Sequence, residues 1–310
     1  MSMARVFFLM GATATGKTDL ALAIAERFDV EIISVDSALV YRGMDIGTAK
    51  PAPSVLQSVP HHLIDIIDPA DAWSAWDFVQ QSRQLVDRIS ARGRLPLLAG
   101  GTMLYYHAFE HGLNRLPEAD DSLRRRLDRE AREHGWPFMH AKLAAVDAAS
   151  AERIKPTDAQ RIQRALEVFE ISGEPLSKLQ QQASSGYPGS IEKMILAVND
   201  RAALHRRIEQ RFQQMLRQGL VEEVSALRQR GDLNLSMPSM RCVGYRQVWQ
   251  HLDAEFSHQE MVDRALAATR QLAKRQITWL RKQPPELSFD CLNYRKGDIF
   301  RRIEAVISRP

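Results

Sequence analysis

A glycine-rich loop between a predicted strand and a predicted helix constrains the fold of this chain more than any other feature. The loop GATATGKT follows the apolar residues 6–10 and precedes a helical pattern over 19–28. Glycines let consecutive backbone N–H groups point inward, and the following helix adds the positive end of its dipole. The loop predicts a site for a di- or triphosphate with Mg²⁺, as in nucleotide-binding and ATP-binding proteins, and Thr18 is the expected metal ligand. Its residues are Gly11, Ala12, Thr13, Ala14, Thr15, Gly16, Lys17 and Thr18.

Strand candidates recur along the chain and alternate with helical patterns. Residues 31–35, 95–99 and 193–198 are short apolar or β-branched runs, and residues 75–92 have the spacing of an amphipathic helix. Such an order favours parallel strands with helices on both faces. We therefore expect an α/β fold, a P-loop doubly wound parallel sheet, in a chain whose 310 residues leave room for a smaller additional unit.

The strand pattern stops between about residues 116 and 189, where helical patterns dominate, and this stretch ends in a linker-like segment at 184–190. Because a strand candidate follows, we interpret the stretch as an insertion. The expected domains are a catalytic core of residues 1–115 and 190–310, and an inserted helical domain of residues 116–189. Helices are also expected at 121–134, 158–172, 201–218, 221–230, 245–252 and 258–281, and a last strand at 287–291.

Composition narrows the class of protein. Hydrophobic residues make up 45% of the chain and charged residues 26%, as in soluble globular proteins. The N-terminal apolar run is too short for a signal peptide, and no stretch approaches 18 uncharged apolar residues, so we expect a cytoplasmic protein with no membrane partner. Cys242 and Cys291 stand far apart, which excludes a CxxC zinc site or a disulfide framework.

Positive charge is unevenly distributed. The formal net charge is only +4, but residues 264–282 hold six basic residues and no acid. The arginines of 124–132, in contrast, are interleaved with acids. A solvated helix face is the usual explanation of such charge, and a surface for a phosphate backbone is the alternative that the missing acids favour.

Two polar residues are expected beside the phosphate loop. Asp36 follows the strand candidate 31–35, and Thr102 follows the candidate 95–99 and two glycines. The carboxyl ends of parallel strands share one edge of the sheet, which is also the edge of the phosphate loop. From the residues alone, Asp36 is equally well a turn former and Thr102 a helix cap.

Seven sequence blocks follow one another along nearly the whole chain: GATATGKT, DSALVYRGMDIGTAKP, PHHLID, LLAGGTMLY, RALEVF, RCVGYRQ and KRQITWLR. Together they resemble the bacterial tRNA dimethylallyltransferases, the tRNA adenosine isopentenyltransferase family. The resemblance implies transfer of a dimethylallyl group from dimethylallyl diphosphate to the exocyclic N6 amine of the adenosine immediately 3′ of the anticodon in tRNA, with release of diphosphate. Leu39 stands where many members carry glutamine, which bears on a polar contact there and not on the class.

The resemblance also implies catalytic roles. Lys17, the backbone N–H groups of residues 13–16 and Mg²⁺ would stabilise the charge on the diphosphate leaving group. Asp36 would take a proton from the adenine amine as the new bond forms. Thr102 would bond the reacting region of a substrate, and Arg211 would contact the diphosphate. Without the resemblance, Arg211 is one more solvated arginine on its helix.

The acceptor implied by the resemblance is the anticodon stem-loop of tRNA, from which the target base is splayed out. In the helix 258–281, apolar residues form one stripe and basic residues another, and the resemblance favours an RNA surface there. We interpret His61 and His62 as structural rather than as metal ligands, and expect a monomer. The residues expected to contact tRNA are Asp36, Ser37, Ala38, Leu39, Thr102, Arg124, Gln160, Arg161, Ile162, Gln163, Arg164, Arg241, Cys242, Val243, Gly244, Tyr245, Arg246, Lys274, Arg275, Gln276, Ile277, Thr278, Trp279, Leu280 and Arg281.

Two other classes of protein share the phosphate loop. A small-molecule or nucleotide kinase often has an acid at the end of a neighbouring strand, and would need an adenine pocket that the sequence does not reveal. An NTP-driven RNA-binding protein would need an acid at the end of a Walker-B strand, whereas the candidate 95–99 ends at Gly100. Both alternatives require ATP, and the transferase does not.

Overall fold

The computed structural model describes residues 5–114, 116–181, 185–284 and 287–307. The chain divides into a core unit, Met1–Glu110 with Tyr187–Pro310, and an inserted unit, His111–Gly186. Residue 115, the expected end of the first core segment, and residue 184, the expected start of the linker, lie outside the described residues. None of the helices formed by the described residues combines the length and the apolar character needed to cross a membrane.

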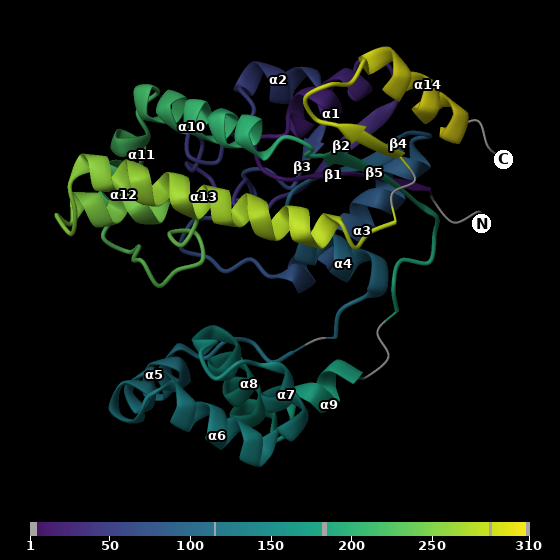
Figure 1. Cartoon of the computed structure of the whole chain (residues 1–310). Coiled ribbons are helices and arrows are strands. Elements are labelled where there is room, and N and C mark those ends of the chain that lie inside the picture. Colours follow the sequence, from purple (N-terminus) through teal and green to yellow (C-terminus); the bar gives the residue numbers. More distant parts are fainter. Residues whose placement is uncertain (1–4, 115, 182–184, 285–286, 308–310) are drawn as a thin grey trace. The chain divides into compact units, whose positions relative to one another are not determined.

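The core unit is built on a parallel sheet, as predicted, with six strands among the described residues (Figure 1). Their order is β3-β2-β4-β1-β5-β6, and every pairing is parallel. All residues of β1 are buried, which explains its uninterrupted apolar sequence. The strands are β1 (Val6–Gly11), β2 (Val30–Val35), β3 (His61–His62), β4 (Leu95–Gly100), β5 (Ile191–Ala197) and β6 (Leu287–Asp290). Since the chain passes from β1 to β2 across β4 and later adds β5 on the other side of β1, the carboxyl end of β1 is the expected ligand-binding point of the sheet.

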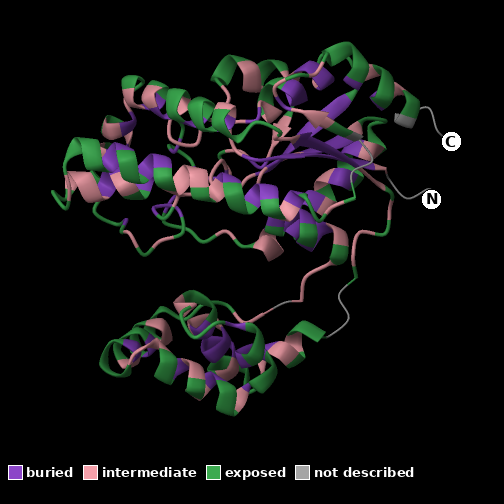
Figure 2. Ribbon diagram, in the orientation of Figure 1, coloured by how far each residue is buried: buried purple, intermediate pink, exposed green. Residues whose placement is uncertain are grey.

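Helices cover both faces of the sheet (Figure 1). On one face α1 (Lys17–Ala25) and α14 (Lys296–Ile307) enclose a cluster that includes Leu20 and Ile303. On the other face lie α3 (Ala75–Ala91) and α4 (Met103–His111), where the ring of Tyr106 packs 4.8 Å from that of Phe8. Figure 2 shows the strands as the most continuously buried part of the core unit. Among the described residues of the core unit, three elements had no counterpart in the predicted pattern: β3, α14 and α2 (Pro53–Ser58), the last in a connection whose composition indicated a loop.

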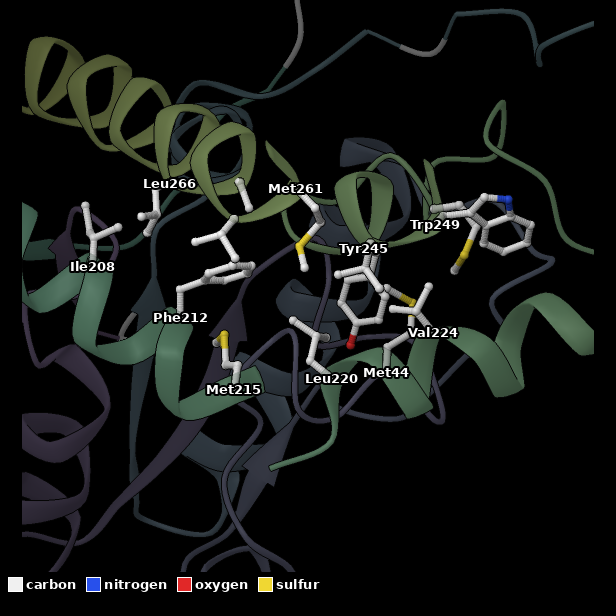
Figure 3. Close-up of a cluster of buried hydrophobic side chains, with 14 of the residues drawn as sticks. Met44, Ile208, Phe212, Met215, Leu220, Val224, Tyr245, Trp249, Met261 and Leu266 are labelled. Atoms are coloured by element: carbon white, nitrogen blue, oxygen red, sulfur yellow. The ribbon is translucent and has the colours of Figure 1, made fainter. Parts of the chain in front are cut away.

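Four further helices pack around an apolar cluster beside the sheet (Figure 3). They are α10 (Arg201–Arg217), α11 (Leu220–Gln229), α12 (Tyr245–Leu252) and α13 (His258–Leu280). Phe212 and Met261 belong to this cluster, as does Met44 from the connection that follows β2. The cluster therefore fixes the connection that follows β2 against these helices, so this connection has a defined conformation.

The inserted unit has its own apolar core, which includes Leu127, Met139 and Ile162. Its helices are α5 (Asp121–His134), α6 (Trp136–Val146), α7 (Ala148–Arg153), α8 (Ala159–Ser172) and α9 (Leu176–Gln181). Side chains of Asp120, Asp147 and Asp158 accept hydrogen bonds from the first turns of α5, α7 and α8, which explains where these helices begin.

Candidate active site

The ends of β2 and β4 are fastened to each other beside the phosphate loop. The carbonyl oxygen of Val35 accepts hydrogen bonds from the N–H groups of Gly101 at 3.2 Å and Thr102 at 3.1 Å. The hydroxyl oxygen of Thr102 accepts from the N–H of Ser37 at 3.2 Å. Asp36 and Thr102 therefore lie at one edge of the sheet, as their strand positions predicted.

Two side chains of the phosphate loop donate hydrogen bonds to one carbonyl oxygen of the same loop. The ammonium of Lys17 donates to the carbonyl oxygen of Ala12 at 2.6 Å, and the hydroxyl of Thr15 donates to the same oxygen at 2.8 Å. Gly16, the N-cap of α1, has a φ of 86°, a conformation that glycine adopts without strain. The exposed Thr18 lies in the first turn of α1, and a helix N-terminus of this kind favours a negatively charged ligand.

One loop amide is used differently from the prediction. The N–H of Thr13 was expected to face the diphosphate together with those of residues 14–16. It donates instead to the side-chain oxygen of Gln276 at 2.9 Å. An amide committed to that side chain does not point to a phosphate, so the expected role of the Thr13 amide is wrong.

A cavity of about 590 Å³ opens beside the loop, which is a size suited to a small ligand. Its wall contains the predicted residues 14–18 and Arg211. Arg207 was missed although it lies one helical turn before Arg211, a spacing that puts both on one face of α10. The sequence reasoning also missed other wall residues. Ala49 and Lys50 belong to one of the seven sequence blocks, and nothing in the sequence singled out Gln214, Gln218 or Tyr294.

Positive charge dominates the wall of this cavity, where basic side chains outnumber acidic ones. Burial and the nearby charge of Arg211 lower the pKa of Lys17 to about 8, against the opposing charge of Asp36. Burial likewise lowers the pKa of Arg211, again opposed by Asp36. The guanidinium of Arg211 donates to the carbonyl oxygen of Thr48 at 3.4 Å. Lys17 and Arg211 are both partly exposed at the cavity wall. Cations held close together in such a site are stabilised by a bound polyanion, so the cavity suits a diphosphate.

Asp36 is both a turn former and a charged member of the site. Its Oδ1 accepts hydrogen bonds from the N–H groups of Ala38 at 2.8 Å and Leu39 at 3.4 Å. Within the described residues no hydrogen bond reaches its Oδ2. One carboxylate oxygen therefore orients the side chain, and the other has no hydrogen-bond partner among the described residues.

The cavity fits a metal ion that takes only one or two oxygens from the protein and the others from a bound phosphate compound and water. Among the described residues no three His, Cys, Asp or Glu side chains are grouped to hold a metal. Thr18 and Asp19 do line the cavity, and Mg²⁺ at phosphate sites typically takes one or two protein oxygens, substrate oxygens and waters. The histidines are placed elsewhere: His62 lies 2.7 Å from the buried carboxylate of Glu31, and His61 bonds a backbone carbonyl.

The structure separates the residues predicted to contact tRNA into exposed and buried ones. A helix exposes only one face, so a whole block such as KRQITWLR cannot face RNA. Exposed members are Ser37, Gln160, Arg161, Arg241, Arg246, Lys274, Arg275, Thr278 and Arg281. Buried members are Ile162, Gly244, Tyr245, Gln276, Ile277 and Leu280, and burial contradicts the predicted contact of these residues with tRNA. The rest are partly exposed: Asp36, Ala38, Leu39, Thr102, Arg124, Gln163, Arg164, Cys242, Val243 and Trp279.

Arg124 and Arg164 are directed at a buried carboxylate of their own unit. Glu167 is fully buried and accepts from Arg124 at 2.8 Å and from Arg164 at 2.6 Å. Burial alone would raise the pKa of Glu167, but these hydrogen bonds and the N–H of Asp120 hold it below its ordinary value. Both arginines therefore stabilise the inserted unit, a role that the sequence reasoning missed.

Tyr245 has a comparable structural role in the core unit. Its hydroxyl donates to Glu223 at 2.5 Å, and the Glu223 carboxylate accepts from the N–H groups of Asp45, Ile46 and Gly47. A Cβ on Gly47 would lie 2.4 Å from the Tyr245 ring, so this close packing requires glycine. The pair holds the segment that leads into the cavity wall.

The chain is similar to known proteins over nearly its whole length. A family model described as IPP transferase matches residues 39–283, and one described as isopentenyl transferase matches residues 4–67. A tRNA dimethylallyltransferase of Alkalilimnicola ehrlichii is 58% identical over 299 residues, 94% of each chain, and one of Janthinobacterium sp. is 55% identical over 98% of each chain. The structure of the full-length tRNA isopentenylpyrophosphate transferase from Bacillus halodurans is 34% identical, with a TM-score of 0.71 over 98% of this chain and 95% of that one. A eukaryotic dimethylallyltransferase acting on tRNA shares the fold, with a TM-score of 0.80 at 21% identity over 99% of this chain and 80% of that one.

Proposed function

This chain belongs to the IPP transferase family. We propose that the cavity beside its phosphate loop is the active site, and that the residues described above catalyse the transfer. The chain transfers a dimethylallyl group from dimethylallyl diphosphate to the exocyclic N6 amine of the adenosine immediately 3′ of the anticodon in tRNA, and releases diphosphate. The observation that supports the assignment of residues is the pairing of the cationic cavity around Lys17 and Arg211 with the free carboxylate oxygen of Asp36.

The diphosphate of the donor binds at the phosphate loop and at the N-terminus of α1. As the allylic carbon–oxygen bond breaks, negative charge grows on the departing diphosphate. Lys17 and Arg211 stabilise that charge, and because hydrogen bonds to Ala12 and Thr48 already hold their side chains in place, little reorganisation is required. Mg²⁺ would be held through Thr18 and would add Lewis-acid stabilisation of the same oxygens.

Asp36 serves the nucleophile. The lone pair of an exocyclic adenine amine is delocalised into the ring, so the amine attacks carbon well only if a proton leaves as the bond forms. Oδ2 of Asp36 accepts that proton while Oδ1 keeps the turn in place. Since the Thr102 oxygen already accepts from Ser37, its own hydroxyl proton is available to orient a substrate acceptor.

The exposed cations Lys274 and Arg275 near the end of α13, with its C-cap Arg281, bind the phosphate backbone of the anticodon stem-loop. Gln160 and Arg161 of the inserted unit are exposed and contribute further contacts. A requirement for Mg²⁺ in particular, a monomeric enzyme and a cytoplasmic site of action stay predictions.

The test is incubation of the protein with tRNA, Mg²⁺ and labelled dimethylallyl diphosphate, with and without ATP. Label should reach the tRNA in both cases, and a tRNA with guanosine at the target position should receive none. Lys17→Ala tests the phosphate loop, and this variant should transfer much less label than the wild type. ATP turnover without label transfer would favour the kinase or the NTP-driven protein and would contradict the transferase.

A further inference from the structure

The buried side chain of Gln276 joins α13 to the ends of two strands. Its Oε1 accepts from the N–H of Thr13 at 2.9 Å, and its Nε2 donates to the carbonyl oxygen of Gly101 at 2.8 Å. Gln276 is 8% exposed. Thr13 follows β1 and Gly101 follows β4, and these strands are neighbours in the sheet. One amide therefore spans the phosphate loop and the turn that carries Thr102, using both its acceptor and its donor.

This contact determines how the loop can face a ligand. The bond from Thr13 holds the first part of the loop against α13, while Lys17 and Thr15 hold Ala12 from within the loop. A Cβ on Gly101 would lie 2.7 Å from Nε2 of Gln276, so a side chain there would push the amide away. Both partners of Gln276 are backbone groups, so its contacts fix the path of the chain.

Lys274 and Arg275 are exposed and directly precede Gln276 on the same helix. One turn of α13 thus carries cations on its outer side and the loop contact on its inner side. We propose that Gln276 is a positioning residue, which holds the phosphate loop and the Gly101–Thr102 turn in the geometry that binds the donor diphosphate. The inference rests on the proposed function, since it takes the ligand of the loop to be that diphosphate. It replaces the RNA contact that the sequence predicted for Gln276.

The test compares variants of one helix in the full-length protein. Gln276→Met keeps the length of the side chain and removes both hydrogen bonds, and Gln276→Glu keeps the acceptor for Thr13 but loses the donor to Gly101. Gln271→Met, an exposed glutamine of α13, is the matched control. Binding of inorganic diphosphate with Mg²⁺ is measured by calorimetry, tRNA binding by mobility shift, and the melting temperature by circular dichroism.

Gln276→Met should bind diphosphate about tenfold more weakly, as expected when two buried backbone groups lose their partner, and its donor KM should rise accordingly. Its tRNA affinity should stay within about twofold of the wild type. Gln276→Glu should bind diphosphate at least as weakly as Gln276→Met, because its buried carboxylate would face the carbonyl oxygen of Gly101. Gln271→Met should bind diphosphate as the wild type does. Should Gln276→Met fail to fold, Gly101→Ala displaces the amide from the other side and should show the same loss.

Weaker tRNA binding with unchanged diphosphate binding overturns the inference, because it returns Gln276 to the RNA surface. A lower melting temperature with both affinities unchanged also overturns it, because the residue is then purely structural. A wild-type protein that binds no diphosphate overturns the proposed function and this inference with it. Wild-type binding together with undiminished binding by Gln276→Met overturns this inference alone.

Discussion

The backbone N–H of Tyr187 donates to the carbonyl oxygen of Glu110 at 3.0 Å, so the two points where the chain leaves and re-enters the core unit are adjacent. The ring of Tyr187 also stacks on that of Phe109, 4.8 Å away. A junction this close lets the inserted unit be removed without straining the core.

We therefore expect that replacing residues 111–186 by three glycines yields a folded core unit that still binds diphosphate. Every described residue that lines the cavity belongs to the core unit, whereas Gln160 and Arg161 are lost. Transfer to tRNA should be abolished. Calorimetry with diphosphate and the label-transfer assay measure the two activities, and loss of diphosphate binding by a folded deletion variant would show that the inserted unit contributes to the donor site.

Asp36→Asn separates the two roles of Asp36. Asparagine keeps an oxygen that accepts from Ala38 and Leu39, so the turn is retained, but it is no base. We expect kcat to fall by roughly 10²- to 10⁴-fold while the donor KM changes little. Steady-state kinetics with saturating tRNA measures both constants. Near-normal turnover would remove Asp36 from the mechanism.

Donor binding should depend on pH through Lys17. Because burial and Arg211 lower the pKa of Lys17 to about 8, the free enzyme loses this cation as pH rises through that value. The ratio kcat/KM for the donor should therefore fall above about pH 8, since that ratio reports the free enzyme. Lys17→Arg stays charged in this range and should lack the fall, whatever its affinity. If kcat/KM for the donor also fell above about pH 8 in Lys17→Arg, the titrating group would be one other than Lys17.

The cationic face of α13 is tested by reversing Lys274 and Arg281 to Glu. Both side chains are exposed, so folding should be unaffected while tRNA binding weakens and its dependence on salt becomes less steep. Reversal of Lys296 and Arg301 on α14 makes the same change in net charge and is the matched control. Equal tRNA affinity in the α13 variant and the wild type would reduce this face to an ordinary solvated surface.

Glu167 should stabilise the inserted unit in a pH-dependent way. Its pKa is lowered in the folded unit, so its contribution is fully present above the unfolded value of 4.5 and is lost as pH falls through the folded value. We expect Glu167→Gln to cost about 1–3 kcal/mol of unfolding free energy at pH 7, and less in acid. Hydrogen exchange in α8 measures this locally. Glu170→Gln, on the same helix but exposed, is the control, and an equal cost there would contradict the prediction.

The sequence by itself determined the features that depend on neighbours in the chain. The glycine spacing of the phosphate loop, the apolar strand before it and the helix after it are local, and each reappears in β1, the loop and α1. The positions of Asp36 and Thr102 also followed from the sequence, because parallel strands place their carboxyl ends at one edge.

Tertiary structure alone decided which partner each polar side chain finds. Gln276 lies 263 residues from Thr13, Arg124 lies 43 residues from Glu167, and no spacing in the sequence indicates either contact. The block KRQITWLR shows which residue types are present in the helix. Only the packing of α13 determines that Lys274 is exposed to solvent and that Gln276 bonds the phosphate loop. The physical reason is that a buried polar group must be satisfied by whichever donor or acceptor the fold brings to it.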